Sequence, residues 1–414
     1  YNNGLRLITK NLGKGKSVTV LILVGAGSRY EKENINGISH FLEHMFFKGA
    51  KKYKNTKQVS EAIDSVGGEF NAFTGKEYAG YYVKVSADHL NLALDVLSDM
   101  LLNSKFDPAE IDKERGVILE EYNMYQDTPM YQIGWDFEKL IFGKNTALGR
   151  DQIGTKELIS TVTQEQFKDY FEKLYTPDNT VISVAGNFDQ SNLEKQIEDL
   201  FKFKDNRKQL KFELLEGLQK EERLYLRDKK TEQAHLVMGY PGYADQSEHY
   251  YASKLLAIIL GGNMSSRMFL NIREDKGLAY YIHASTDDYY DIGTFSVNAG
   301  VSVDKIELAM ESIINEYQEV TANGITPETS KAKAYLKGKL TLRLEDSEEY
   351  AHLMAKYELL QGAYKTPEKI AENIDAVTAD QVDFVARDLF KPEELRIVII
   401  GPYDNEERFK KFLH

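Results

Sequence analysis

The sequence predicts an α+β fold made of two similar halves, each with a mixed sheet and several helices. At 414 residues, the chain is too long for one ordinary hydrophobic core. Strand-like and helix-like segments follow one another in mixed order, with hairpin-like strand pairs, which argues against a doubly wound parallel sheet. Blocks of the first half also recur in the second half at a nearly constant spacing, which indicates a duplicated domain.

The repeat is visible in three blocks. TPDNTVISVAGNF resembles KPEELRIVIIGPY, so that Pro177 corresponds to Pro392, 215 positions later. Upstream, YYVKVSADHLNLALDVL resembles FSVNAGVSVDKIELAMESI. Pro108 and Pro327, each preceded by a helix-capping residue, begin a helix in each half, because proline suits the first helical position.

Each half reads as strand, two helices, strand pair, long helix, further helices, strand and helix. In the first half VTVLILVG is a buried strand, EFNAF and AGYYVKV are a strand pair, and LNLALDVL begins a helix. The second half repeats this order with AHLVMGY, YASKLLAIIL, GTFSVNA and IELAMESIINEY. We expect domains at 1–205 and 221–414, joined by a polar linker at 206–220.

Composition excludes several classes of protein. The chain has no cysteine, which excludes disulfides and thiolate ligands, and no apolar run approaches the length of a membrane span. The net charge of −13 argues against nucleic acid; it suits cationic peptides and serves solubility equally well. No targeting signal is visible, so we expect a cytoplasmic bacterial protein. Because the chain starts at Tyr1 without Met, the mitochondrial matrix or the periplasm are alternatives with a trimmed leader.

The segment His40-Phe41-Leu42-Glu43-His44 carries the clearest chemical signal. Two histidines four positions apart lie on one face of a helix, so both imidazoles can reach a single zinc ion. Glu43 beside them can take a proton from a zinc-bound water. The order is the reverse of His-Glu-x-x-His, which is the inverzincin pattern. The flanking helix is apolar, where unsatisfied polar groups are costly, so the metal interpretation is favoured over ordinary polar residues.

A catalytic zinc needs a third protein ligand, and without cysteine it must be His, Asp or Glu. In the helix AEIDKERGVILEEYNMY, Glu114 and Glu121 lie on one face, and Glu120 points about 100° away. One of these carboxylates can bind zinc while another accepts a hydrogen bond from a ligand histidine. Solvated glutamates along a helix rim are the alternative.

The second half carries no metal motif. Aligning Gly262 with Gly49 puts Ser253, Leu256 and Ala257 at the positions of the two histidines and the glutamate between them. The segment LGGNMSSRMFLNIREDKGLAYYIHAS lacks the Gly-Lys-Ser/Thr ending of a phosphate loop, so nucleotide binding is not expected.

HFLEH, followed 77 positions after His44 by the Glu121 of ERGVILEE, resembles the pitrilysin-type (M16) inverzincin zinc metallopeptidases. The mitochondrial processing peptidase branch and its bacterial relatives are the most similar. This resemblance, which covers nearly the whole chain, implies one zinc ion per chain, held by His40, His44 and Glu121. It also implies that Glu43 is the catalytic base and Glu114 a supporting carboxylate. The implied fold is a pair of homologous α+β domains arranged as a clamshell, of the LuxS/processing-peptidase-like kind.

The resemblance also implies the substrate-binding residues. Arg273 and Tyr280, seven residues apart in the second half, would hold the substrate and steady an oxyanion. Asn71, Ala72 and Phe73 would belong to an edge strand that pairs with the backbone of the peptide.

The expected function is therefore that of a zinc-dependent endopeptidase, a hydrolase of peptides and of unfolded or presequence-like segments. The expected assembly is a homodimer, with a heteromer of related subunits as the alternative. The family also contains non-catalytic binding or scaffold subunits of processing-peptidase-like complexes. Such subunits typically lose the metal motif, so its presence here favours an enzyme.

Overall fold

The computed structural model describes residues 1–13, 15–204, 206–219 and 221–413. The chain forms two compact units, and each is discontinuous in sequence. The first unit comprises Tyr1–Asn123, Asp151–Glu213 and Thr341–Thr366. The second unit comprises Met124–Arg150, Leu214–Leu340 and Pro367–His414.

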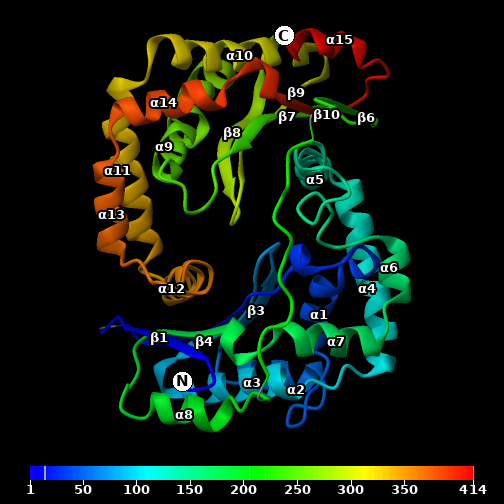
Figure 1. Cartoon of the computed structure of the whole chain (residues 1–414), viewed down its shortest axis with the longest axis vertical. Coiled ribbons are helices and arrows are strands. Elements are labelled where there is room, and N and C mark those ends of the chain that lie inside the picture. Colours follow the sequence, from blue (N-terminus) through cyan, green and yellow to red (C-terminus); the bar gives the residue numbers. More distant parts are fainter. Residues whose placement is uncertain (14, 205, 220, 414) are drawn as a thin grey trace. The chain divides into compact units, whose positions relative to one another are not determined.

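The sheet of the first unit has five strands in the order β1-β5-β2-β4-β3. Figure 1 labels its two edge strands, β1 and β3. Its strands are β1 (Arg6–Asn11), β2 (Ser17–Val24), β3 (Glu69–Thr74), β4 (Ala79–Ser86) and β5 (Thr180–Gly186). β1 pairs in parallel with β5, and the other neighbours are antiparallel. β3 is consequently an edge strand, joined to β4 by a short turn.

The helices of the first unit include the one that carries the histidine motif. They are α1 (Ile38–Phe46), α2 (Thr56–Asp64), α3 (Leu90–Asn103), α4 (Pro108–Asp127), α6 (Lys156–Thr161), α7 (Gln164–Leu174), α8 (Leu193–Leu200) and α12 (Ser347–Gln361). The short 3-10 helix η1 (Ser28–Tyr30) precedes α1. The last residues of α4, from Met124 onward, belong to the second unit.

The second unit repeats the same sheet in the order β6-β10-β7-β9-β8. Its strands are β6 (Leu224–Asp228), β7 (Gln233–Gly242), β8 (Ala279–Asp288), β9 (Gly293–Ser302) and β10 (Arg396–Gly401). Its helices are α5 (Pro129–Phe142), α9 (Tyr250–Gly261), the π-helix η5 (Phe269–Asp275), α10 (Ile306–Asn323), α11 (Thr326–Arg343), α13 (Pro367–Ala376), α14 (Ala379–Leu389) and α15 (Glu407–Lys410). The last residues of α11, from Thr341 onward, belong to the first unit. The parallel pair is β6 with β10, as it is β1 with β5 in the first unit.

These two sheets confirm the predicted fold class and the duplication. Pro177 and Pro392 each begin a 3-10 turn that leads into the equivalent strand, β5 or β10. The sequence interpretation missed β1 and β6, the edge strands that complete each sheet. Both are short, and neither has a buried apolar face, so their side-chain pattern gives little signal.

The two halves exchange one helix each, which the predicted division at 1–205 and 221–414 did not include. α5 precedes residue 205 yet belongs to the second unit, and α12 follows residue 221 yet belongs to the first. Asp205 and Lys220, at the edges of the predicted linker, lie outside the described residues. An amphipathic pattern shows that a helix covers a sheet, but it does not show which sheet it covers.

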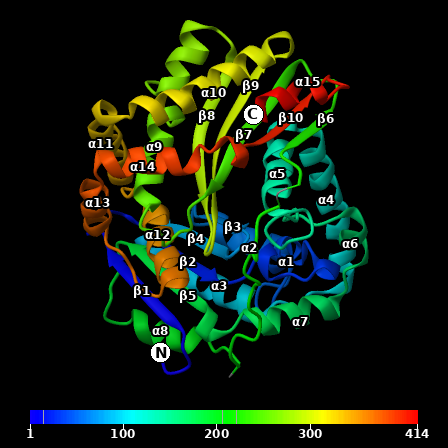
Figure 2. The same cartoon turned by 45° about the horizontal axis from the view of Figure 1, so that its top comes forward.

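Buried apolar contacts hold the exchanged helices. In the first unit, Tyr350 and Met354 of α12 pack with Leu21, Leu23 and Val181 of the sheet, and Figure 2 shows α12 lying over these strands. In the second unit, α5 packs against β7 and β10 through a matching cluster, which contains Ile133, Phe137, Leu140, Val237 and Val398. Each fully buried side chain of this kind stabilises its unit by roughly 1.5–3 kcal/mol.

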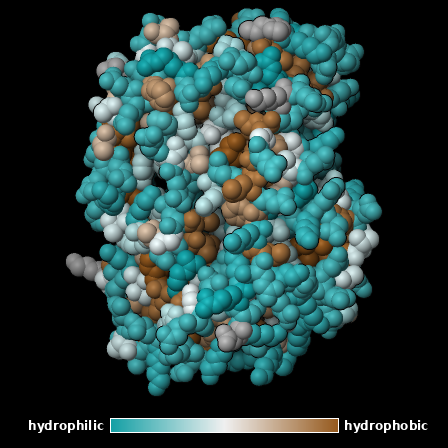
Figure 3. All heavy atoms as spheres, in the orientation of Figure 1, coloured by the Kyte–Doolittle hydropathy of each residue, from teal (hydrophilic) through white to brown (hydrophobic). Residues whose placement is uncertain are grey.

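The surface contrasts with these cores. Hydrophilic residues cover most of the face drawn in Figure 3, and hydrophobic residues appear there as separate patches. Among the residues that the structure describes, no helix is long and apolar enough to cross a membrane.

Candidate metal centre

The start of α1 is fixed by a buried carboxylate. Glu31 accepts hydrogen bonds from the backbone N–H groups of Gly37, at 2.7 Å, and Ser39, at 2.8 Å. The side chain of Asn36 donates a third bond, at 2.9 Å. Burial raises the pKa of Glu31, and these donors oppose that rise. Gly37 is left-handed, with φ of 96°, and a Cβ there would lie 2.5 Å from the carbonyl oxygen of Ile153, so only glycine fits.

The sequence of α1 separates an apolar side from a polar one. Phe41, Leu42 and Met45 are buried, while Glu43 and the two histidines are only partly buried. Packing of the apolar side fixes the rotation of the helix, so the polar side chains project together toward α4 and β3. Their local arrangement therefore follows from the core behind them.

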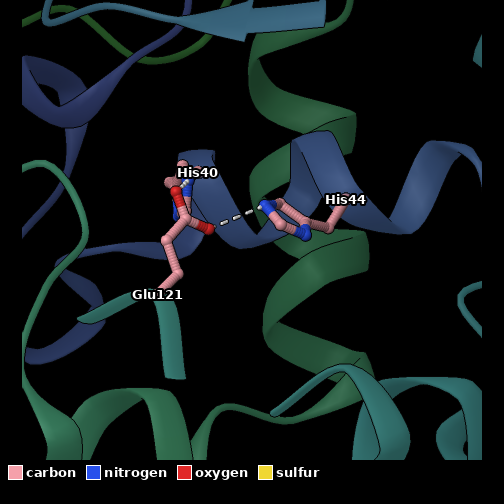
Figure 4. Close-up of side chains that lie close together, drawn as sticks. All are labelled: His40, His44 and Glu121. Carbon is pink, nitrogen blue, oxygen red and sulfur yellow. Dashed lines mark ion pairs between the residues drawn. The ribbon is translucent and has the colours of Figure 1, made fainter. Parts of the chain in front are cut away.

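His40, His44 and Glu121 come together and could hold one metal ion. Each offers one ligand atom, and these atoms lie within 4.8 Å of one another. Figure 4 shows the carboxylate of Glu121 between the two imidazoles: Nε2 of His40 is 3.5 Å from Oε1, and Nε2 of His44 is 3.5 Å from Oε2. Two ligands bound tetrahedrally at zinc–nitrogen distances lie about 3.3 Å apart, so this spacing fits a zinc site.

The structure separates the three glutamates that the sequence offered as ligands. Only Glu121 lies in the metal-binding group. Glu114 is buried on the far side of the His44 ring. Its Oε1 accepts a hydrogen bond from Nδ1 of His44 at 2.9 Å, and its Oε2 pairs with Nζ of Lys48 at 2.5 Å. Glu120 is exposed on another side of α4. A carboxylate bonded to the far nitrogen of a histidine is the usual support for a metal-ligating imidazole.

The two imidazoles are supported unequally. Nδ1 of His44 has Glu114 as its partner, whereas Nδ1 of His40 is buried without a hydrogen-bond partner among the described residues. Among the residues that the structure describes, a carboxylate therefore fixes the ring of His44 but not that of His40.

The electrostatics of the group favour a bound cation. Hydrogen bonds from His40 and His44 hold the pKa of Glu121 well below its usual range, against the effect of burial. Burial lowers the pKa of His44, but Glu114 and Glu121 outweigh it and raise the value to about 9. Two carboxylates thus draw a proton onto this imidazole, and a divalent cation can replace that proton.

Glu43 lies beside this group without belonging to it. Its Oε2 accepts a hydrogen bond from Oγ1 of Thr74, at 2.6 Å, near the end of β3. The other predicted residues of this strand are Asn71, which is exposed, Ala72, which is buried, and Phe73, which is partly buried. The structure therefore brings the predicted base, the metal-binding group and the predicted edge strand together within the first unit.

Arg273 and Tyr280 belong to the second unit. Arg273 lies in the π-helix η5, where its guanidinium is 4.5 Å from the centre of the Phe269 ring. Tyr280 lies on β8, where the residue is 58% exposed. The two residues thus lie on neighbouring elements, the π-helix η5 and the edge strand β8.

The sequence interpretation gave no role to Lys48 or Glu31, and it placed Thr74 on the edge strand without relating it to Glu43. Lys48 follows His44 by four positions, and this spacing could have indicated that it shares the face of the histidine. Glu31 and Thr74 lie outside the helix, and no local spacing relates them to it.

Comparisons with known proteins agree with this geometry. Residues 6–150 match the family model described as insulinase (peptidase family M16), and residues 161–333 match the model of the peptidase M16 inactive domain. A Bacillus subtilis protein named "uncharacterized zinc protease YmxG" is 39% identical over 407 residues, which is 97% of each chain. This chain belongs to peptidase family M16. A zinc protease of Streptomyces coelicolor, also named as uncharacterized, is 36% identical over 98% of this chain and 89% of its own.

Two solved structures share the fold of this chain. A protease from Helicobacter pylori superposes with a TM-score of 0.87 at 22% identity, over 97% of each chain. The M16 inactive domain protein of Pseudomonas fluorescens gives 0.88 at 18% identity, over 97% of each chain. The match of the inactive-domain model agrees with the lack of a metal motif in the second half. The relatives' names and the His-His-Glu group identify zinc as the metal of this M16 peptidase.

Proposed function

We propose that this M16 peptidase is a zinc endopeptidase that hydrolyses peptides and unfolded or presequence-like segments. The observation that carries the proposal is the grouping of His40, His44 and Glu121 next to an uncoordinated Glu43. This set provides three protein ligands and a separate base, which is the composition of a catalytic rather than a structural zinc site.

The proposed ligands are the two imidazole Nε2 atoms and the carboxylate of Glu121. A zinc ion held there supplies Lewis acidity toward water and the carbonyl oxygen of the scissile peptide. Glu114 holds the ring of His44 in place through its Nδ1 atom. Because that bond leaves Nε2 pointing toward Glu121, the protein itself selects which nitrogen is available.

Glu43 is the proposed general base. Its carboxylate accepts a proton from the attacking water and then passes it to the nitrogen of the leaving amine, so that one side chain serves both transfers. Its position in the sequence, between two ligands, keeps it within reach of the same reacting atoms without making it a ligand.

The proposed substrate is an extended chain. β3 is the edge of its sheet, and Asn71, Ala72 and Phe73 occupy its middle, so a peptide can add to it by backbone hydrogen bonds. Recognition through the backbone tolerates many side chains and requires an unfolded substrate. Arg273 and Tyr280 are proposed to hold the substrate and to steady the oxyanion.

The test is a mass-spectrometric map of cuts in a peptide library, made with the zinc-loaded chain and repeated with a chelator. Glu43→Gln should retain one zinc per chain and lose turnover by about 10²- to 10⁴-fold, because an amide cannot accept the proton. His40→Ala should lose the metal. Glu61→Gln, which makes the same change on an exposed part of α2, is the matched control and should behave like wild type.

Four results would count against the proposal or a part of it. Unchanged turnover in Glu43→Gln would remove the base, and full zinc occupancy in His40→Ala would remove the ligand set. A zinc-loaded wild-type chain that cuts nothing would favour a non-catalytic binding subunit. In the same assay Tyr280→Phe and Arg273→Ala should lower kcat/KM by about 10²- to 10³-fold, and wild-type values would exclude both residues from the site.

A further inference from the structure

Glu43 has a partner on the edge strand. Oγ1 of Thr74 donates to its Oε2 at 2.6 Å, and both side chains are partly buried. Directly after the end of α1, the ring of Phe47 lies 5.6 Å from the ring of Phe70, four residues before Thr74 on β3. α1 and β3 are thus in contact at two levels, one polar and one aromatic.

Thr74 stands at a fixed point of the sheet. It is the last residue of β3 and pairs with Ala79 of β4. The turn between the strands is closed by a hydrogen bond from the N–H of Gly75 to the carbonyl of Tyr78, at 2.8 Å. As a β-branched residue, threonine also has a restricted side-chain torsion, so a fixed backbone aims its hydroxyl.

The segment around η1 anchors this turn. The N–H of Arg29 donates to the carbonyl of Lys76, at 2.9 Å. The guanidinium of Arg29 also pairs with the carboxylate of Glu77, at 2.5 Å, and both side chains are buried. Because a buried charge that loses its partner strongly destabilises a protein, this ion pair holds the turn close to η1.

The same segment anchors the helix that carries Glu43. Glu31 follows η1 directly, and its carboxylate binds the N–H groups of Gly37 and Ser39 at the start of α1. Arg29 therefore fixes the hairpin and Glu31 fixes the helix, from positions two residues apart. The separation of Thr74 from Glu43 is set by one short stretch of chain.

We propose that Thr74 is a positioning residue for Glu43: its hydroxyl holds one carboxylate oxygen and leaves the other free to accept the proton of the attacking water. This inference rests on the proposed function, since it assigns a partner to the proposed base. A glutamate side chain has three rotatable torsions, so without this donor its carboxylate samples orientations that are not productive. The placement is a property of the first unit alone.

The experiment compares kcat, KM, zinc content and thermal unfolding for Thr74→Val and Thr74→Ser. Valine keeps the volume and branching but removes the hydroxyl, so kcat should fall by about 10- to 100-fold with KM within about twofold. Serine keeps the hydroxyl and should restore most of kcat. Thr9→Val makes the same change on β1, the opposite edge of the same sheet, and should leave kcat, KM and zinc content unchanged.

Zinc content of one per chain and an unchanged unfolding temperature establish that each variant is intact. If Thr74→Val does not fold, Thr74→Ala removes the hydroxyl with a smaller side chain and serves in its place. Wild-type kcat in an intact Thr74→Val or Thr74→Ala would overturn the inference, as would a loss that serine does not restore. An active wild type with an equally active valine variant contradicts only the role of Thr74. A wild type without zinc-dependent cleavage contradicts the proposed function itself.

Discussion

The hydrogen bond between Glu114 and His44 allows the strength of the zinc site to be tested without changing a ligand. The carboxylate of Glu114 accepts from Nδ1 of His44, at 2.9 Å, and from Lys48, at 2.5 Å, and Glu114 is only 5% exposed. Glu114→Gln keeps the shape of the side chain but removes its charge. The amide oxygen can accept from His44 or from Lys48, while the amide NH2 opposes the other donor.

The magnitude follows from these contacts. A hydrogen bond to a charged group contributes roughly 1.5–3 kcal/mol, and about 1.4 kcal/mol corresponds to a factor of ten in a binding constant. Because glutamine preserves one of the two bonds in part, we expect zinc affinity to fall by about 10- to 100-fold, the range typical of such supporting residues. His40 should not compensate, since its Nδ1 has no partner among the described residues.

The assay is a competition titration of zinc against a chelator of known affinity, at fixed pH. Glu120→Gln is the matched control, because it makes the same substitution on an exposed side of the same helix and should leave the affinity unchanged. Equal zinc affinities for Glu114→Gln and Glu120→Gln would refute the supporting role of Glu114. Loss of all zinc from Glu114→Gln at a saturating concentration would instead indicate that Glu114 is itself a ligand.

Two further predictions concern stability. Met354→Ala in α12 should lower the free energy of unfolding by about 2–5 kcal/mol in urea titrations, because it removes apolar cover from Leu21 and Leu23. A chain ending at residue 205 lacks α12 altogether and should not fold stably. Wild-type stability in either variant would refute the exchange of helices. His352, packed against Phe73 and Tyr78, has its pKa lowered by burial to about 4, so the unfolded chain binds more protons than the folded one between about pH 6.5 and 4. The contribution of neutral His352 to folding stability is fully present above pH 6.5 and is lost as pH falls, by at most about 3 kcal/mol. His352→Gln should remove this loss from the pH dependence of the urea midpoint. An identical pH dependence in the variant would contradict the prediction.

The sequence by itself determined the elements whose signal is local. Four-residue spacing put His40 and His44 on one helix face, because the pitch of an α-helix is the same in every protein. The recurrence of Pro177 at Pro392 revealed the duplication, which the identical strand orders of the two sheets confirm. The resemblance to M16 peptidases, carried by the motif and the distant glutamate, is confirmed by the family models.

Tertiary structure decided what depends on packing between distant segments. The spacing along α4 left Glu114 and Glu121 equivalent, and their separate roles were implied by the family resemblance alone. The docking of this helix against α1 shows that Glu121 faces both imidazoles and that Glu114 lies behind His44. Thr74 meets Glu43 because a buried carboxylate and a buried ion pair fix a helix and a hairpin to one segment. The exchange of α5 and α12 likewise depends on which sheet the apolar face of each helix packs against. Hydrophobic burial stabilises such a contact whether the helix and the sheet are near or far apart in the sequence.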